Sequence, residues 1–542
     1  MERWLVRDYH PAPAEEPMPQ QRAADRFARY LRFRSVLDDP FVELDLCLSG
    51  MSEADVQALQ APLARALAAM KSIEGGALAN ADEKRQVGHF WLRAPGLAPS
   101  PDIEQVIVKT IAAIGSFTES IHSGKLAPPE GGAFTKVVLC GIGGSALGPM
   151  LLADAFGGPD APMSLCVLDN TDPEGIDREL AELGTLQDAL VIVISKSGGT
   201  METRNGMLEI DRACRNQGLS FAPRAVAVTM PGSALHQRAE KEGWLATFPM
   251  WDWVGGRSSI LSAVGLLPGA LLGMDIRAFL AGAAAMDDAT RRADVWQNPA
   301  AMLAAYWHHE GKGRGERAMV VLPYKDRLLL LSRYLQQLVM ESLGKEHDRQ
   351  GRVVNQGIAV YGNKGSTDQH AYVQQLRDGR HDFFALFVRV LQDRAAGHFE
   401  VEPGATSGDF LDGFWQGTRS ALFEKGRTSA TLCCQQLDER VLGALIALFE
   451  RTVAIYAELV DINAFHQPGV EAGKRAAAKV LALQQQLLAA LAAAPQDVKA
   501  LAAKVSADPA DCWPILQHLA ANRPEIAAAQ VHDPLTARFQ KR

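Results

Sequence analysis

The chain has 542 residues, of which 47% are hydrophobic and 22% are charged, and its formal net charge at pH 7 is −8. This length suits about two to four globular domains. The negative net charge provides no positive electrostatic field that would bind nucleic acid, which disfavours a nucleic-acid partner. Seven scattered cysteines without a CxxC pair predict reduced thiols in a cytoplasmic protein. The most apolar stretch, residues 260–274, is short and broken by glycine and proline, so neither secretion nor membrane insertion is expected.

The first 125 residues predict a helical N-terminal region. A proline-rich opening over residues 11–19 leads into helical patterns that continue to Arg93. Nothing in this region has the spacing of a catalytic motif.

Residues 126–285 predict a doubly wound parallel α/β domain. Four short apolar runs, each followed by a polar or glycine-rich turn, alternate with helical patterns in this part of the chain. The runs span residues 136–140, 163–168, 189–194 and 225–229.

A second α/β domain of similar plan is predicted over residues 286–474, and a helical tail over 475–542. The second series of apolar runs spans residues 318–322, 357–361 and 383–391, with a helix expected from Arg327 to Ser342. The tail is rich in Ala, Leu and Gln, and its prolines cut it into short helices without visible chemistry.

A glycine turn follows the run that ends at Cys140. Gly143, Gly144 and Ser145 lie between this expected strand and a helix, a geometry that points backbone N–H groups and a positive helix end at an anion. The same segment satisfies the G-x-G-x-x-A pattern, and Asp169 could bind a ribose. A nicotinamide-dependent oxidoreductase is therefore one alternative.

A second polar turn follows the strand expected over residues 189–194. Its sequence, Ser195-Lys196-Ser197-Gly198-Gly199-Thr200, groups three hydroxyls around two glycines, as expected for a cradle that holds one phosphate monoester. The alternative is that the serines serve only as turn and helix-cap residues. A dinucleotide fold has no need of this second loop, which favours a phosphate monoester over a nicotinamide ligand.

An ordered set of motifs over residues 80–475 resembles the glucose-6-phosphate isomerase family. The set comprises Gly143–Ser145, Ser195–Thr200, Gly255–Ser258, Met340–Lys345, Asp368–Tyr372 and Gln467–Lys474. The resemblance implies two sugar-isomerase (SIS) domains, each an αβα sandwich, in a cytoplasmic homodimer with shared active sites. It also implies interconversion of D-glucose 6-phosphate and D-fructose 6-phosphate, in glycolysis and gluconeogenesis.

Aldose–ketose isomerisation needs a base at carbon, a cation near the enediolate, groups that open the sugar ring and a phosphate anchor. The resemblance implies Glu341 as the base, Arg257 as the cation, and His370 with Lys474 for ring opening. We expect the two glycines before Arg257 to admit a ligand and to keep its guanidinium clear of packing. The implied substrate-binding residues are Gly144, Ser145, Ser195, Lys196, Ser197, Thr200, Gln337 and Gln467.

From the residues alone, Glu341 could instead be a solvated helix-end glutamate paired with Lys345. His370 could be an ordinary loop histidine, although neighbouring Asp368 could orient its ring. No metal or organic cofactor is expected, because the histidines lack ligand spacing such as HExxH.

Three departures from the family pattern affect the site. The phosphate loop has Ser-Gly-Gly-Thr where animal members have Thr-Phe-Thr-Thr, Pro468 could shift Gln467, and the tail is longer than usual. The tail could serve as an arm that wraps a dimer partner. A phosphosugar-binding sensor without catalysis, and an isomerase that also accepts mannose 6-phosphate, stay open as alternatives.

Overall fold

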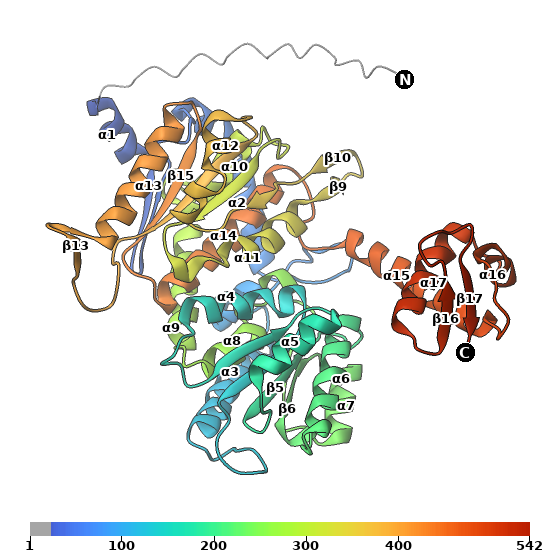
Figure 1. Ribbon diagram of the computed structural model, residues 1–542. Coiled ribbons are helices and arrows are strands. Elements are labelled where there is room, and N and C mark those ends of the chain that lie inside the picture. The colour runs from blue at the N-terminus through green and yellow to red at the C-terminus, as the bar shows by residue number, and fades with distance from the viewer. Residues whose placement is uncertain (1–22) are drawn as a thin grey trace, which may run out of the picture. The chain divides into compact units, whose positions relative to one another are not determined.

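The computed structural model describes residues 23–542, apart from the side chains of residues 23–25, 470–472, 474 and 475 (Figure 1). The chain divides into two compact units at His466, with the second unit running from Gln467 to Arg542. The first unit contains both expected α/β sheets.

The described part of the N-terminal region, residues 23–125, is largely helical and also supplies two strands that we did not predict. Two of its helices begin with side-chain caps: Ser52 and Asp55 form a capping box for the helix Glu53–Glu74, and Ser100 caps the helix that begins at Pro101. The elements are α1 (Ala23–Arg32), β1 (Arg34–Asp38), β2 (Phe41–Asp45), α2 (Glu53–Glu74) and α3 (Pro101–His122).

The first sheet is parallel and has the order β4-β3-β5-β6-β7 within the described chain. Its strands are β3 (Lys136–Cys140), β4 (Ser164–Leu168), β5 (Ala189–Ile194), β6 (Ala225–Thr229) and β7 (Ala246–Pro249). The four predicted strands are confirmed, and β7 is additional. Alternate residues of β3 pack into two different cores: Val137 and Leu139 on one face, Val138 and Cys140 on the other. The sheet is therefore covered on both faces, as the doubly wound prediction required.

Helices cover the two faces of this sheet separately (Figure 1). On one face lie α3 and α8, and on the other lie α5, α6 and α7. Their bounds are α5 (Pro173–Leu183), α6 (Met201–Asn216), α7 (Ala234–Glu242) and α8 (Ala263–Leu271).

The second sheet has the order β1-β2-β15-β12-β8-β11. Four of its strands are parallel, namely β8 (Ala318–Pro323), β11 (Val360–Tyr361), β12 (Phe383–Val390) and β15 (Ser429–Cys434). The hairpin β1–β2 completes one edge, because β2 pairs antiparallel with β15. The N-terminal region thus belongs to a sheet whose other strands come from the second half of the chain.

The helix expected from Arg327 to Ser342 changes its winding along its length. A 3-10 turn, η7 (Asp326–Leu328), precedes α11 (Leu331–Leu335), and a π-helical turn, η8 (Gln336–Glu341), follows it. Leu335, Leu338 and Val339 are buried, so the apolar pattern that predicted the helix does mark its inner face. Single π turns occur frequently at functional sites.

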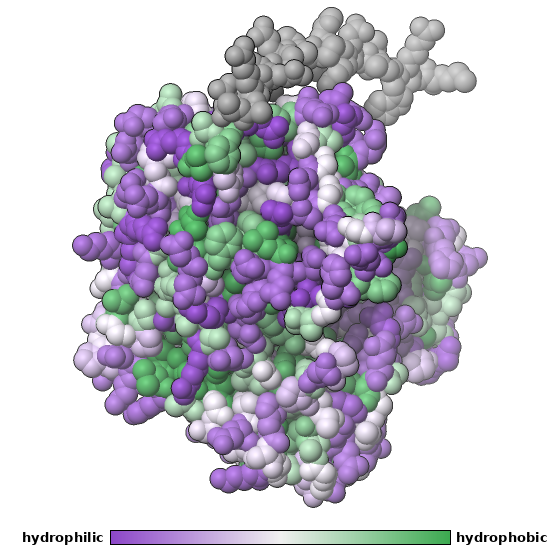
Figure 2. Space-filling view, turned by 90° about the vertical axis from the view of Figure 1, so that its left-hand side faces the viewer, coloured by the Kyte–Doolittle hydropathy of each residue, from purple (hydrophilic) through white to green (hydrophobic). Residues whose placement is uncertain are grey.

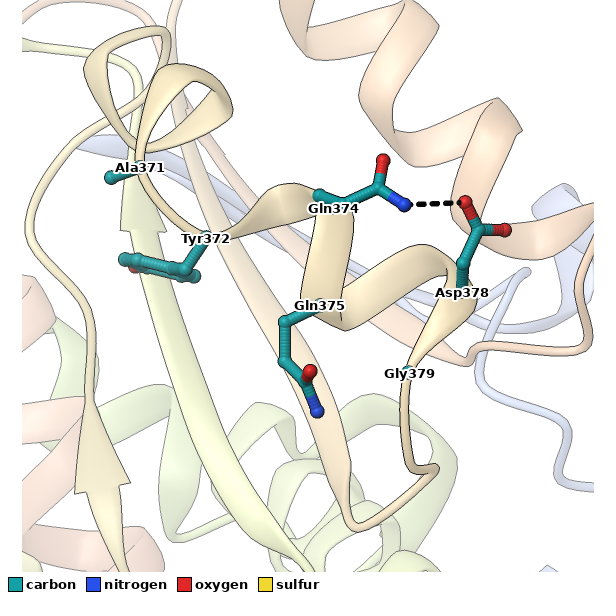
Figure 3. Close-up of a pocket in the computed structure, with 6 residues that line it drawn as sticks. All are labelled: Ala371, Tyr372, Gln374, Gln375, Asp378 and Gly379. Carbon is teal, nitrogen blue, oxygen red and sulfur yellow. Dashed lines mark hydrogen bonds between the residues drawn. The ribbon is translucent and has the colours of Figure 1, made fainter.

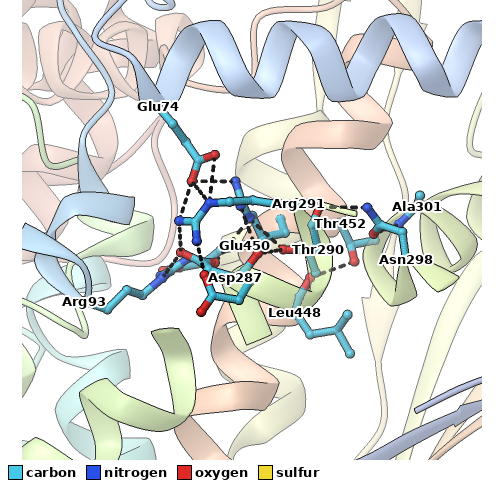
Figure 4. Close-up of polar contacts among 12 residues, drawn as sticks. Glu74, Arg93, Asp287, Thr290, Arg291, Asn298, Ala301, Leu448, Glu450 and Thr452 are labelled. Carbon is cyan, nitrogen blue, oxygen red and sulfur yellow. Dashed lines mark hydrogen bonds and ion pairs between the residues drawn. The ribbon is translucent and has the colours of Figure 1, made fainter. Parts of the chain in front are cut away.

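Helices α9 (Ile276–Thr290) and α14 (Glu439–Leu459) pack together around a buried ion network (Figure 4). Asp287 Oδ2 lies 2.7 Å from Arg93 Nε, and Asp287 Oδ1 lies 3.2 Å from Arg451 Nε. Arg451 also reaches Glu74 at 3.0 Å, and Arg93 also binds Glu450. Burial works against ionisation of Asp287, but Arg93 and Arg451 hold its pKa below the ordinary value. The network joins the N-terminal region to both helices.

The second unit has a hydrophobic core of its own. Its elements are α15 (Pro468–Ala490), α16 (Val498–Val505), α17 (Pro509–Asn522), β16 (Ile526–Ala529) and β17 (Arg538–Lys541). Leu487, Leu501, Leu516 and Phe539 are fully buried among these elements. The helices of the tail were predicted, whereas the β16–β17 hairpin was not. No helix in the described part of the chain is long and apolar enough to cross a membrane.

We expect Asp287→Asn to destabilise the first unit by about 3–5 kcal/mol, because the change leaves buried arginines without their shared counter-charge. Asp288→Asn is the matched control. Asp288 also pairs with Arg291, but its side chain is 79% exposed, so its loss should cost below about 1 kcal/mol. Urea unfolding followed by circular dichroism measures both effects. Equal stabilities of the two variants would contradict this role of the network.

Candidate active site

Both predicted phosphate loops lie at the carboxyl edge of the first sheet. Strands β3 and β5 are hydrogen-bonded neighbours, with Cys140 opposite Val193, and each strand ends directly before one of the loops. The chain leaves β3 toward β4 on one side and β5 toward β6 on the other, so this is the point where the strand order reverses. Ligands of open α/β sheets bind at such a point.

The glycine turn packs backbone against backbone with a distant loop. It forms η3 (Gly143–Ser145) and leads into α4 (Leu147–Phe156). A Cβ on Gly144 would lie 2.2 Å from the carbonyl oxygen of Gly256, so neither a larger residue nor a shifted loop fits here. We expected the two glycines before Arg257 to let a ligand approach the backbone. At Gly256 the space is taken instead by the backbone of Gly144.

The Ser195–Thr200 loop combines turn-forming and anion-binding features. Ser195 Oγ accepts a hydrogen bond from Gly198 N, and Ser197 Oγ accepts one from Gly199 N, both at 3.1 Å. These are the turn roles of the alternative interpretation. The loop nevertheless ends at the N-terminus of α6, and Thr200 makes no side-chain cap hydrogen bond there. The positive end of a 16-residue helix thus stands beside the hydroxyls.

Lys196 tethers this loop to the segment that precedes Gly255. Its Nζ donates hydrogen bonds to the carbonyl oxygens of Asp252 and Val254, each at 3.1 Å. Burial lowers the pKa of Lys196 to about 8. Lys196 therefore brings positive charge to the cradle and also holds two loops together.

Arg257 lies in η5 (Gly256–Ser258) and is buried, which makes our expectation of an unpacked guanidinium wrong. It donates hydrogen bonds to Ser342 Oγ at 3.0 Å and to the carbonyl oxygens of Ala464 at 2.5 Å and His466 at 3.2 Å. These acceptors come from segments far away in the sequence. Burial lowers the pKa of Arg257, but an arginine stays charged in proteins.

Glu341 ends the π-helical turn and faces Arg257. Its Oε2 atom lies 3.8 Å from Arg257 Nε, and its side chain is 20% exposed. Gln337, on the same turn, places its amide nitrogen near the glycine turn, 3.1 Å from where a Cβ on Gly143 would lie. The structure thus brings the predicted base, the predicted cation and the glycine turn together.

Lys345 is a buried cation at this site whose function the sequence did not indicate. Its Nζ donates a hydrogen bond of 2.7 Å to the main-chain carbonyl of Glu341. Burial, and then Arg257, lower the pKa of Lys345 to about 7, while Glu341 acts in the opposite direction. The i+4 spacing suggested a solvated ion pair, whereas Lys345 is only 5% exposed.

The loop that carries Asn80 and Asp82 braces the segment that Arg257 binds. Asn463 Nδ2 donates hydrogen bonds to Asn80 Oδ1 at 3.2 Å and to Asp82 Oδ2 at 2.5 Å. Ala464 follows directly, and its carbonyl accepts from Arg257. We expected no chemistry in this N-terminal block. The block instead holds the Asn463–Ala464 segment in place, through hydrogen bonds between residues more than 380 positions apart in the sequence.

His370 is exposed and ends the short helix η9 (Thr367–His370). Asp368 does not serve the role we considered for it. Its carboxylate accepts hydrogen bonds from Asn363 N at 2.9 Å and Asn363 Nδ2 at 3.1 Å, and another from the Tyr372 hydroxyl. Asp368 therefore anchors the loop rather than orienting the His370 ring.

A pocket of about 440 Å³ begins one residue beyond His370 (Figure 3). Helix α12 (Val373–Asp378) carries much of its wall. The pocket is lined by Ala371, Tyr372, Gln374, Gln375, Asp378 and Gly379. None of these is one of the predicted site residues, although Ala371 and Tyr372 belong to the Asp368–Tyr372 motif.

The last two predicted residues belong to the second unit. Gln467 is half-buried and directly precedes α15, whose first residue is Pro468, a position at which proline is compatible with a helix. The backbone of Lys474 is helical within α15, and its side chain lies outside the described residues. The described residues contain no cluster of three or more His, Cys, Asp or Glu side chains that could hold a metal ion.

Comparison with known families gives one family match. The model of the family described as phosphoglucose isomerase matches residues 54–401 and 417–492. Among curated proteins, the glucose-6-phosphate isomerase of Thermosynechococcus vestitus is 56% identical over 91% of this chain and 93% of its own length. That of Synechococcus elongatus is 54% identical over 96% and 99%, respectively. That of Geobacter sp. M21 is 53% identical over 93% and 97%.

Solved structures show the same similarity in three dimensions. A glucose-6-phosphate isomerase from Chlamydia trachomatis matches with a TM-score of 0.76 and 26% identity, covering 85% of this chain and 91% of that one. A hypothetical protein from Thermus thermophilus matches with a TM-score of 0.67 and 30% identity, covering 81% of this chain and all of the other.

We expect Gly144→Ala to destabilise the protein by about 1–3 kcal/mol, because the new methyl group collides with the backbone of Gly256. Gly115→Ala in α3 is the control, since a Cβ there meets nothing within 4 Å. It should stabilise the helix by about 0.5–1 kcal/mol. Thermal unfolding followed by circular dichroism gives Tm for both. A Tm unchanged by Gly144→Ala would show that the two loops are not in contact.

Proposed function

The chain belongs to the phosphoglucose isomerase family, and from this premise we propose how its residues interconvert D-glucose 6-phosphate and D-fructose 6-phosphate. The protein is an aldose–ketose isomerase of glycolysis and gluconeogenesis. The observation that carries the mechanism is the approach of Glu341 to Arg257 beside the two phosphate loops.

The proton transfer is assigned to Glu341. Its carboxylate removes the proton from C2 of the open-chain aldose. The electrons of that C–H bond form the C1–C2 double bond, while the carbonyl oxygen at C1 gains negative charge. The hydroxyl proton on O2 passes to O1. Glu341 then returns the abstracted proton to C1 while the electrons left on O2 form the C2 carbonyl, which gives the ketose. Arg257 stabilises the enediolate with a charge that is already desolvated and held by hydrogen bonds.

The phosphate of the substrate is assigned to the edge where β3 and β5 end. On one side lies the glycine turn with Gly144 and Ser145. On the other side, hydroxyl groups at the start of α6 come from Ser195, Ser197 and Thr200. Lys196 adds positive charge to the cradle. Gln337 and Gln467 are assigned to the sugar hydroxyls.

Ring opening is assigned to His370 and Lys474, with His370 supplied by a second copy of the chain. The exposure of His370 supports this assignment, because an exposed imidazole is available to a neighbouring subunit. A dimer also fits the apolar surface near β13 (Glu400–Glu402) and α13 (Ser407–Phe423), where Phe399, Val401, Phe410 and Phe414 are exposed. Figure 2 shows apolar patches on the side of the molecule where β13 lies.

We assign the protein to the cytoplasm. All seven cysteines lie within the described residues and are free thiols, which suits a reducing compartment. The proposed chemistry requires neither a metal nor an organic cofactor, since Arg257 supplies the positive charge that the enediolate needs.

We expect Glu341→Gln to lower kcat by about 10²–10⁴-fold while KM changes little, because the change removes the base and almost no volume. Conversion of fructose 6-phosphate is followed with a coupled dehydrogenase that reports glucose 6-phosphate. Glu346→Gln, whose side chain is 70% exposed, is the control and should keep wild-type turnover. Wild-type protein that binds the sugar phosphate without converting it would favour the phosphosugar sensor, and near-normal turnover of Glu341→Gln would exclude Glu341 as the base.

The shared site makes a prediction of its own. Subunits carrying Glu341→Gln and subunits carrying His370→Ala should each be inactive alone. Mixed dimers should regain activity, because one of their two sites receives both intact residues. Tagged subunits allow the heterodimer to be purified and assayed. A verified heterodimer without activity would show that each site is built from one chain.

A further inference from the structure

A buried lysine stands at the end of the helix that carries the proposed base. Lys345 begins β9 (Lys345–His347) and is only 5% exposed. Removing an ammonium group from water costs free energy unless other groups compensate. The proposed mechanism gives this charge no task, so its position requires an explanation.

The hydrogen bond of Lys345 fixes the peptide from which the Glu341 side chain extends. The last carbonyl groups of a helix have no partners within the helix, and a cation at that end is favourable. Lys345 Nζ binds the Glu341 carbonyl at 2.7 Å, and Gly344 N binds the preceding carbonyl, that of Met340, at 2.8 Å. These two bonds close the end of the π-helical turn.

The Glu341 carboxylate lies near Arg257 and also interacts electrostatically with Lys345. Arg257 Nε lies 3.8 Å from Glu341 Oε2, and Arg257 and Glu341 are the charged groups that act on Lys345. His466 faces the same group. Burial, and then the positive charge of Lys345, lower the pKa of this histidine. Lys345 thus supplies positive charge from the side of the helix end.

We propose that Lys345 is a positioning residue for the proton transfer, holding the Glu341 peptide in place and keeping its carboxylate directed at the substrate carbon. This inference rests on the proposed function. Displacement of a reacting group by about 1 Å can lower the rate about 10²-fold. A single hydrogen bond to the main chain of Glu341 can therefore affect the rate of proton transfer.

The test measures kcat, KM and the primary deuterium isotope effect, using fructose 6-phosphate with and without deuterium at C1. Lys345→Met should lower kcat by about 10–100-fold with KM within about 3-fold. The isotope effect should rise, because a misplaced base slows the C–H step and leaves ring opening unchanged. A purely structural role would lower the amount of active enzyme without changing the isotope effect.

Three further variants sharpen the result. Lys345→Gln retains an N–H donor without charge, and Lys345→Arg retains charge and donors, so both should recover part of the lost kcat. Lys136→Met is the matched control: Lys136 Nζ also binds carbonyl oxygens, those of Leu183 and Thr185, but at the amino end of β3. It should keep the wild-type kcat and isotope effect.

The proposal is overturned if Lys345→Met has the wild-type kcat, or if its kcat falls while the isotope effect stays at the wild-type value. If Lys345→Met does not fold, Lys345→Gln decides by the same two measurements. Wild-type protein that fails to convert fructose 6-phosphate would overturn the proposed function itself, an outcome distinct from either result with the variants.

Discussion

The buried guanidinium of Arg257 is the interaction on which the rest of the site depends. It reaches the end of the Glu341 helix through Ser342 and the end of the first unit through Ala464 and His466. Its own loop is fixed in turn by the backbone contact between Gly144 and Gly256. One cation therefore connects the phosphate edge of the first sheet with the helix of the second. In the proposed mechanism, the charge of Arg257 that would stabilise the enediolate belongs to the same side chain that ties these distant segments together.

The local charge of the site differs from that of the whole protein. The chain is acidic overall, yet Lys196, Arg257 and Lys345 lie in the proposed site, which has to stabilise a doubly charged phosphate ester and an enediolate. Each of these cations binds main-chain carbonyl oxygens. Carbonyl groups are neutral dipoles, so they orient a cation without cancelling its charge. The site can hold positive charge in a desolvated place for this reason.

Much of the fold could be predicted from the sequence, because buried strands such as Ala189–Ile194 are continuous apolar runs that end in glycine-rich turns. Strands with weaker patterns were missed: β15 contains small residues, and β2 contains acidic ones. The roles that we propose for the site residues rest on the ordered motifs, which do not indicate which of these residues are buried. Arg257 finds its carbonyl acceptors more than 200 residues away, and Lys345 resembles any surface lysine beyond a helix. Such contacts depend on tertiary packing, which a local sequence pattern does not reveal.

The edge hairpin of the second sheet has a consequence for biosynthesis. All strands of the first sheet lie within residues 136–249, so that sheet can form while the rest of the chain is still being made. The hairpin β1–β2 is made first, but β2 cannot pair with β15 until β15 has been synthesised. Roughly 380 residues separate Asp45 from Ser429, which corresponds to about 20–80 s of translation at 5–20 residues per second. Throughout that interval the ribosome-bound chain presents an unpaired strand edge, so the second sheet closes after the first although its first strands emerge earlier.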